Sequence, residues 1–139
     1  MELGLIRPSS SPYASSVVMV KKKDRTFRMC IALRDLNKKN VKNRLPIPRI
    51  HDPIDELHGA NFFSNIDLSS CYHKIWTREE DIPKTAFKCH YGHFEFGSMP
   101  FVLTNSLSTF QSCMNNIFDK QLRNFVLLFF DDILIYNKI

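Results

Sequence analysis

The chain has 139 residues, the size of one domain, and 44% of them are hydrophobic, which is enough to build a core. The net charge is +5, and residues 1–50 carry 12 Lys or Arg against 3 Asp or Glu, which favours binding to a polyanion. Four scattered cysteines, no signal-peptide pattern and no apolar stretch of about 20 residues exclude a disulfide-stapled secreted domain and a membrane-spanning protein. We therefore expect an intracellular protein of the cytoplasm or nucleus.

The first predicted elements form a basic hairpin. Residues 7–15 are rich in proline and serine and predict an irregular leader. Residues 16–20 and 27–32 are strand-like and are joined through Asp24 and Arg25. The tip of this hairpin and its approach are strongly basic.

A helix and a strand are predicted next. Two prolines precede a helix whose apolar face is Ile50, Ile54 and Leu57 and which ends at Gly59. Three of the six residues at 62–67 are apolar, and the segment predicts a buried strand.

The second half of the chain predicts two hairpins and a long helix. Residues 85–90 and 93–96 flank a turn at Tyr91 and Gly92. A helix is expected over residues 107–121, and an acid-tipped hairpin closes the chain. The apolar face of that helix is Leu107, Phe110, Met114, Ile117 and Phe118. Because strands and helices mix without a regular βαβ repeat, the predicted fold class is α+β.

Asp131 and Asp132 are adjacent acids inside an apolar run that extends from Phe125 to Tyr136. Neighbouring carboxylates repel each other and are costly beside apolar surface unless a positive charge neutralises them. A divalent cation with oxygen ligands would do so. The alternative is a polar turn that joins two buried strands.

Asp67 stands at the end of the strand predicted over residues 62–67, and small residues follow it. Such a segment offers carboxylate and carbonyl oxygens for ions and N–H donors for phosphates, as a metal-bound triphosphate requires. Together with Asp131 and Asp132 it would complete a site of three carboxylates. Alone, Asp67 could equally be a strand-end turn residue or a helix cap.

Further motifs follow one another along almost the whole chain. They are RPSSSPY at residues 7–13, VKKKD at 20–24, LPIP at 45–48, FSNIDL at 63–68, KTAF at 84–87, MPF at 99–101, TFQ at 109–111 and FFDD at 129–132. In this order they resemble the reverse transcriptases of long-terminal-repeat retrotransposons, closest to the gypsy/Ty3-like group.

The resemblance implies the fingers and partial palm of a right-hand polymerase. Fingers would comprise about residues 1–42 and 75–104, and the palm about residues 43–74 and 105–139. The family's reaction is attack of a primer 3′-hydroxyl on the α-phosphate of a deoxynucleoside triphosphate, with an RNA or DNA template and two Mg²⁺ ions, or Mn²⁺ in their place.

The resemblance also assigns roles to individual residues. Asp67, Asp131 and Asp132 match the metal-binding acids, Asp67 and Asp131 most directly. Leu68 would add its backbone carbonyl.

Four further positions match nucleotide-binding residues. Lys22 and Arg28 match contacts to the incoming triphosphate, for which point charge and forked guanidinium are suited. Tyr72 matches the aromatic residue under the sugar, and Phe101 the wall of the nucleotide pocket. Tyr72 and Phe101 could instead be core aromatics, and Arg28 could pair with Glu95 or another acid.

Several positions depart from the family pattern. A β-branched residue is poorly tolerated wherever the pattern's glycine has a positive φ. The departures are Ala32, Leu33, Ser69, Cys71 in place of Gly, Val102 in place of Gly, and Leu107 in place of Pro.

The family's thumb is expected to be missing, and another chain would supply the missing subdomains. We therefore expect slow or undetectable polymerisation by the chain alone. The alternative is an inactive nucleic-acid-binding or structural remnant of a retroelement. The ordered motifs argue against an unrelated Mg²⁺-dependent phosphohydrolase.

Overall fold

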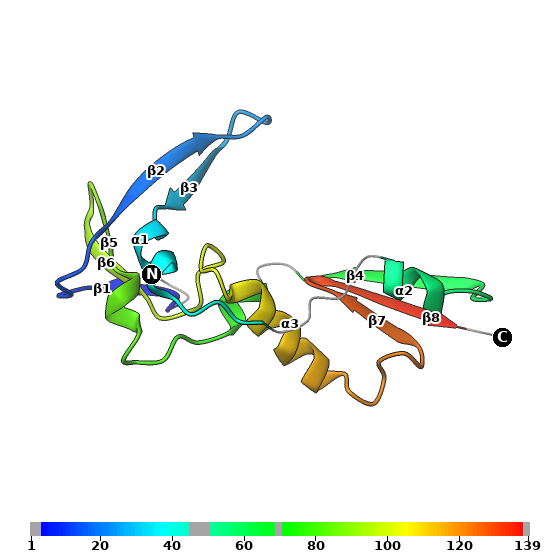
Figure 1. Ribbon diagram of the computed structural model, residues 1–139. Helices are drawn as coiled ribbons and strands as arrows, with labels where there is room; N and C mark the ends of the chain where they lie inside the picture. Colours follow the sequence, from blue (N-terminus) through cyan, green and yellow to red (C-terminus); the bar gives the residue numbers. More distant parts are fainter. Residues whose placement is uncertain (1–3, 45–50, 69–70, 138–139) are drawn as a thin grey trace. The chain divides into compact units, whose positions relative to one another are not determined.

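The computed structural model describes residues 4–44, 51–68 and 71–137 (Figure 1). The chain divides into two compact units. Unit 1 comprises residues 1–41 and 72–104, and unit 2 comprises residues 42–71 and 105–139.

Unit 1 is built on a five-stranded sheet with the order β1-β6-β5-β2-β3. All neighbouring strands are antiparallel except β2 and β5, which are parallel. The strands are β1 (Ile6–Pro8), β2 (Ser15–Lys21), β3 (Phe27–Ile31), β5 (Phe87–Cys89) and β6 (Gly92–Phe96). The short helices are α1 (Arg34–Lys39) and the 3₁₀ turns η1 (Cys71–Lys74), which begins in unit 2, and η2 (Ile82–Thr85).

Aromatic packing forms the core of unit 1. The ring of Phe87 lies 5.2 Å from that of Phe96 and 6.0 Å from that of Phe94, both in tilted arrangements. Ile31 and Leu33 complete the buried cluster. The core therefore lies where β3 leads into α1 and beside the β5–β6 hairpin.

The leader predicted over residues 7–15 is wrong at Arg7 and Pro8, which form β1 with Ile6 against β6, and at Ser15, where β2 begins. A strand of three residues that includes Pro8 gives no alternation for sequence reasoning to detect. Its partner strand carries Glu95, a buried carboxylate that accepts hydrogen bonds from Ser9 Oγ at 2.6 Å and Arg7 Nε at 2.8 Å. The Ser9 hydroxyl first, and then the Arg7 guanidinium, lower the pKa of Glu95.

The basic hairpin is confirmed as β2 and β3, with Met19 opposite Met29 in an antiparallel register. Asp24 accepts hydrogen bonds from the Thr26 hydroxyl at 2.6 Å and its N–H at 3.0 Å, and these lower the pKa of Asp24. Arg25 has a φ of 69°. Both faces of the ribbon carry exposed apolar side chains, namely those of Val18, Met19, Val20, Phe27 and Met29.

Unit 2 contains a three-stranded antiparallel sheet with the order β4-β8-β7 (Figure 1). Its strands are β4 (Phe62–Asp67), β7 (Val126–Phe129) and β8 (Asp132–Asn137), and its helices are α2 (His51–Glu56) and α3 (Ser106–Ile117). Helix α3 packs against β7. The buried side chains include Phe110, Met114, Val126, Leu127, Leu128, Ile133 and Tyr136.

Two expectations about burial in unit 2 are wrong. Strand β4 has the predicted bounds, but all six of its residues are exposed rather than buried; α3 packs against β7, at the opposite edge of the sheet. The apolar face of α3 is buried only in its middle, since Leu107 and Ile117 near its ends are 42% and 63% exposed. The helix also ends at Ile117, before the predicted end at residue 121.

Two further differences concern helices. Helix α1 was not predicted, because six residues with one apolar side chain, Leu36, show no helical periodicity. In α2 the predicted face is only partly described: Ile54 is exposed, and Ile50 lies outside the described residues. Gly59 follows α2 with a φ of 81°, as expected for a residue that ends a helix. No helix in the described segments is both long and apolar enough to cross a bilayer.

Candidate active site at the ends of β4 and β8

Two of the three predicted acids face each other across neighbouring strands. Asp67, the last residue of β4, is opposite Asp132, the first residue of β8. Residues directly opposite in an antiparallel pair share a face, with Cβ atoms about 4.5–5.5 Å apart. Both side chains are exposed, and Asn65 Nδ2 lies 3.5 Å from Asp132 Oδ1, a long hydrogen bond. The sheet therefore presents two carboxylates at one of its ends.

Asp131 lies beside this pair, in the turn between β7 and β8. Phe130 and Asp131 form that turn, and Phe129 is paired with Asp132 where the strands begin. The Asp131 carbonyl accepts a hydrogen bond from Leu68 N–H at 3.0 Å. The backbone thus holds Leu68, the residue after β4, against the acid turn.

Phe130 has an unusual backbone conformation, with a φ of 55°. Positive φ at the first residue of a two-residue hairpin turn is usually supplied by glycine. A bulky side chain in this region costs of order 1–3 kcal/mol unless its surroundings hold it there. The Phe130 ring packs edge-on against that of Phe129, with centroids 4.7 Å apart. The Phe130 N–H donates to Gln111 Oε1 at 3.0 Å, so a side chain of α3 reaches the turn.

The oxygen donors at this end of the sheet are of the type that Mg²⁺ and Mn²⁺ prefer. Their carboxylates are not gathered around a common point, since the described residues contain no group of three or more His, Cys, Asp or Glu side chains arranged to hold a metal ion. Asp131 lies in the turn, outside the strand register that makes Asp67 and Asp132 direct partners. The donors fit the ion, and binding would require the three carboxylates to turn toward a common point.

The predicted triphosphate contacts lie in unit 1, on the basic hairpin. Arg28 is opposite Val20, and Lys22 N–H donates to the Thr26 carbonyl at 2.7 Å, which continues the strand pairing past Lys21. Lys22 and Arg28 are therefore diagonal neighbours on one face, a relation that places backbones about 7–8 Å apart. Glu95 is not the partner of Arg28, because its carboxylate accepts hydrogen bonds from Arg7 and Ser9.

The two predicted aromatic contacts also belong to unit 1. Tyr72 lies in η1 and is half-buried. Phe101 lies between β6 and α3 and is 49% exposed, so it is not a core aromatic. The structure therefore groups Lys22, Arg28, Tyr72 and Phe101 in unit 1, and the acids and Leu68 in unit 2.

Residues 20–139 match the family model described as reverse transcriptase (RNA-dependent DNA polymerase). The chain belongs to the reverse transcriptase family. It is 44% identical over 112 residues to an RNA-directed DNA polymerase homolog of Oenothera berteroana, covering 81% of this chain and 79% of that protein. It is 41% identical over 139 residues to the retrovirus-related Pol polyprotein from transposon 297 of Drosophila melanogaster. That match covers 96% of this chain and 13% of the polyprotein, so the chain spans a small part of such relatives.

Solved structures show the same fold. The foamy viral protease-reverse transcriptase in complex with double-stranded DNA superposes with a TM-score of 0.88 at 19% identity, over 99% of this chain and 24% of that one. The foamy viral protease-reverse transcriptase in complex with an RNA/DNA hybrid gives 0.83 at 19% identity, over 98% and 18%. These findings confirm the resemblance to retrotransposon reverse transcriptases and the α+β fold with fingers and partial palm.

The departures from the reverse transcriptase pattern are accommodated locally. Neither Val102 nor Cys71 is among the residues with positive φ, so a side chain at either position causes no strain of that kind. The Val102 carbonyl accepts a hydrogen bond from Asn37 Nδ2 at 2.9 Å, and Cys71 is buried. Leu33 is a core residue of unit 1, and Leu107 is the second residue of α3. Ser69 lies outside the described residues.

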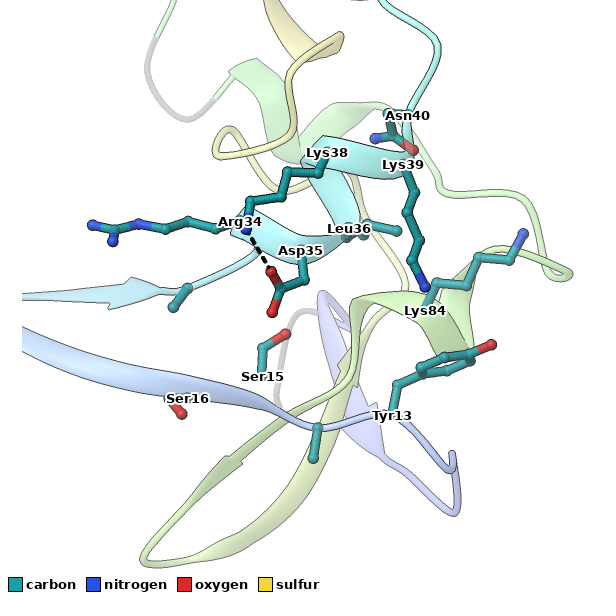
Figure 2. A pocket seen from close by; sticks show the side chains of 12 residues that line it. Tyr13, Ser15, Ser16, Arg34, Asp35, Leu36, Lys38, Lys39, Asn40 and Lys84 are labelled. Carbon is teal, nitrogen blue, oxygen red and sulfur yellow. Dashed lines mark hydrogen bonds and ion pairs between the residues drawn. The ribbon is translucent and has the colours of Figure 1, made fainter.

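A basic cavity of about 650 Å³ lies in unit 1 between α1 and the segment that leads into β2 (Figure 2). Two of its cations are already paired, Lys38 with Asp35 at 3.1 Å and Lys84 with Asp81 at 2.6 Å. The Asp81 contact raises the pKa of Lys84. Positive charge beside an exposed aromatic ring suits a nucleic-acid backbone and its bases. The charged and aromatic lining consists of Tyr13, Arg34, Asp35, Lys38, Lys39 and Lys84.

Sequence reasoning missed Gln111 as part of this reverse transcriptase site. Its side chain is 3% exposed, although it lies among the apolar residues of α3. An amide on the apolar face of a helix must find buried hydrogen-bond partners, and this was the available signal. The sequence did not indicate which backbone group that partner would be.

Proposed function

We propose that the chain carries the nucleotidyl-transfer site of an RNA-directed DNA polymerase. In this proposal Asp67, Asp131 and Asp132 hold two Mg²⁺ ions, or Mn²⁺, and the Leu68 carbonyl adds an oxygen ligand. Bound divalent cations would stabilise the attacking and leaving oxygens of the phosphoryl transfer. The primer 3′-hydroxyl forms a bond to the α-phosphate of a deoxynucleoside triphosphate, and pyrophosphate leaves.

Residues of unit 1 would bind the nucleotide. Lys22 and Arg28 supply positive charge and N–H donors to the triphosphate oxygens. Tyr72 would lie under the sugar, and Phe101 would form a wall of the nucleotide pocket. An RNA or DNA template paired with a primer is the macromolecular partner.

One observation carries the proposal. Asp67 and Asp132 are far apart in the sequence, yet they are direct partners in the β4–β8 register, and Leu68 is bonded to Asp131. A strand end and a hairpin turn that bring acids together are what a shared divalent-metal site needs. A polar turn without such a role would not require an acid on the neighbouring strand.

Primer extension on an RNA template tests the proposal. We expect weak extension with Mg²⁺ or Mn²⁺, reduced about 1,000-fold or more in Asp67→Asn and Asp131→Asn, because each removes a charged metal ligand. Asp119→Asn is the matched control, since Asp119 is an exposed acid of unit 2 away from the turn. Extension that survives both test substitutions would refute the assignment of the acids.

A second candidate function is nucleic-acid binding without turnover, which the basic cavity and the basic hairpin favour. It predicts binding that weakens steeply with salt, because phosphate contacts release counterions. Salt-sensitive binding of a primer–template, with no extension by the unsubstituted chain and no effect of Asp131→Asn on binding, would select this candidate over the polymerase.

A further inference from the structure

We infer that Gln111 is a positioning residue that holds the Phe130–Asp131 turn in the conformation required by the acids. The effect of Gln111 on metal binding rests on the proposed function. Its effect on the turn rests only on contacts within unit 2. Gln111 touches neither acid side chain. Its effect would be transmitted through the backbone of the turn.

The backbone conformation of Phe130 needs a contact that stabilises it. Phe130 has a φ of 55°, a conformation that a phenylalanine rarely adopts. Its N–H points to Gln111 Oε1 at 3.0 Å rather than to a partner within the hairpin. If this bond were absent, the turn would lose a contact that favours the strained conformation over a relaxed one.

The Gln111 side chain is itself fixed in position. Its side chain is 3% exposed, and its Nε2 donates to Asn115 Oδ1 at 2.9 Å, one turn further along α3. This second bond directs the amide oxygen, rather than the nitrogen, toward Phe130. Because α3 packs against β7, the strand that leads into the turn, the helix provides a rigid base for the contact.

The backbone links the turn to the acids. Asp131 follows Phe130, and its carbonyl is bonded to Leu68 N–H at 3.0 Å, next to Asp67. One hydrogen bond therefore joins Gln111 to Phe130, and a second joins Asp131 to Leu68, the residue after β4. Substituting a residue that orients a metal ligand typically lowers metal affinity by about 10–100-fold.

The experiment compares Gln111→Met, which keeps the size and removes the acceptor, with Gln111→Glu, which keeps an acceptor oxygen. Gln121→Met is the matched control, since Gln121 belongs to unit 2 but lies at the other end of β7. The first measurement is amide hydrogen exchange at Phe130, with amide chemical shifts at Asp131 and Leu68. The second is the Mn²⁺ dissociation constant, from the paramagnetic broadening of amide signals around Asp67.

We expect Gln111→Met to accelerate exchange at the Phe130 amide about tenfold and to shift the Asp131 and Leu68 signals, because one hydrogen bond is lost. We expect it to weaken Mn²⁺ binding roughly tenfold, while Gln111→Glu restores most of both and Gln121→Met changes neither. Lower thermal stability with unchanged Asp131 and Leu68 shifts and unchanged Mn²⁺ binding would overturn the inference, since a purely structural glutamine gives that result.

Two further outcomes separate this inference from the proposed function. If the unsubstituted chain binds no Mn²⁺, the metal proposal fails, while the exchange and shift measurements still decide whether Gln111 holds the turn. If Gln111→Met fails to fold, the Gln111 substitutions are compared in a chain that also carries Phe130→Gly. Glycine accepts positive φ without strain. In that background the amide shifts of Asp131 and Leu68 should therefore differ less between Gln111→Glu and Gln111→Leu than they do without Phe130→Gly. An undiminished difference would contradict the inference.

Discussion

The basic hairpin β2–β3 and the acid hairpin β7–β8 have the same topology but are stabilised in different ways. Each is an antiparallel pair whose connection contains a non-glycine residue at positive φ, Arg25 in one and Phe130 in the other. The basic loop is held by its own residues, through Asp24 and Thr26. The acid turn is held by a side chain from α3, Gln111.

The difference extends to the strands. Apolar residues of the basic hairpin are exposed on both of its faces, whereas β7 is buried along most of its length. Binding a flexible triphosphate needs positive charge on side chains that extend into solvent, which an exposed hairpin supplies. Holding metal ligands needs a fixed geometry, which is better supported by packed elements. The two hairpins thus match the two tasks proposed for them.

The largest expected effect tests whether burial separates the hairpins. Val126 in β7 is 2% exposed and Val18 in β2 is 52% exposed. Val126→Ala should lower the free energy of unfolding by about 2 kcal/mol, because it deletes buried methyl groups and leaves a cavity. Val18→Ala should change it by less than about 0.5 kcal/mol. Amide hydrogen exchange reads the stability of each hairpin separately.

Equal losses for the two valines would break the comparison. They would mean that the apolar surface of the basic hairpin is covered in solution, as it would be if two copies of the chain associated through it. The oligomeric state of the chain, measured by sedimentation, would then distinguish that explanation from an unexpectedly tolerant site at Val126.

The acid hairpin shows what a sequence can reveal. Its two apolar runs and the acids between them have a simple pattern, and the structure has strands and a turn at those places. Strand β4 was also predicted with its observed bounds, because its ends are marked by polar residues. The pairing of Asp67 with Asp132 could be suspected from the acids, but their register is a long-range property that no local pattern contains.

What the sequence did not reveal depends on tertiary neighbours. The apolar residues of β4 suggested burial, yet the strand is exposed, and α3 packs against β7 at the opposite edge of the sheet. Strand β1 exists because it pairs with β6 and because Arg7 and Ser9 satisfy Glu95. Gln111 resembles an exception to an apolar face until its partner, a backbone N–H distant in sequence, is known.

A smaller effect concerns the sheet in which the basic hairpin is rooted. The pKa of Glu95 is lowered by the Ser9 hydroxyl and by Arg7. A carboxylate whose folded pKa lies below its unfolded value of about 4.3 stabilises the fold above that value and loses this contribution as pH falls through the folded pKa. Glu95→Gln should therefore cost about 1–2 kcal/mol at neutral pH and flatten the loss of stability in acid.

Thermal unfolding between pH 7 and pH 3 measures this effect. Glu79→Gln is the control, because the exposed Glu79 carboxylate also pairs with Arg7, at 3.1 Å. Its substitution should have little effect, as expected for an exposed ion pair. An acid dependence of Glu95→Gln equal to that of the unsubstituted chain would show that other carboxylates dominate.

The smallest expected effect concerns the cations of the basic hairpin. Lys22→Gln and Arg28→Gln should each weaken binding of a deoxynucleoside triphosphate, measured with Mg²⁺ present, roughly three- to tenfold, since each removes one charged contact to the triphosphate oxygens. Lys120→Gln, at an exposed lysine of unit 2, is the control. Neither substitution should alter Mn²⁺ binding near Asp67, because the acid hairpin is stabilised within its own unit. A loss of Mn²⁺ binding in Arg28→Gln would show instead that the two hairpins depend on each other.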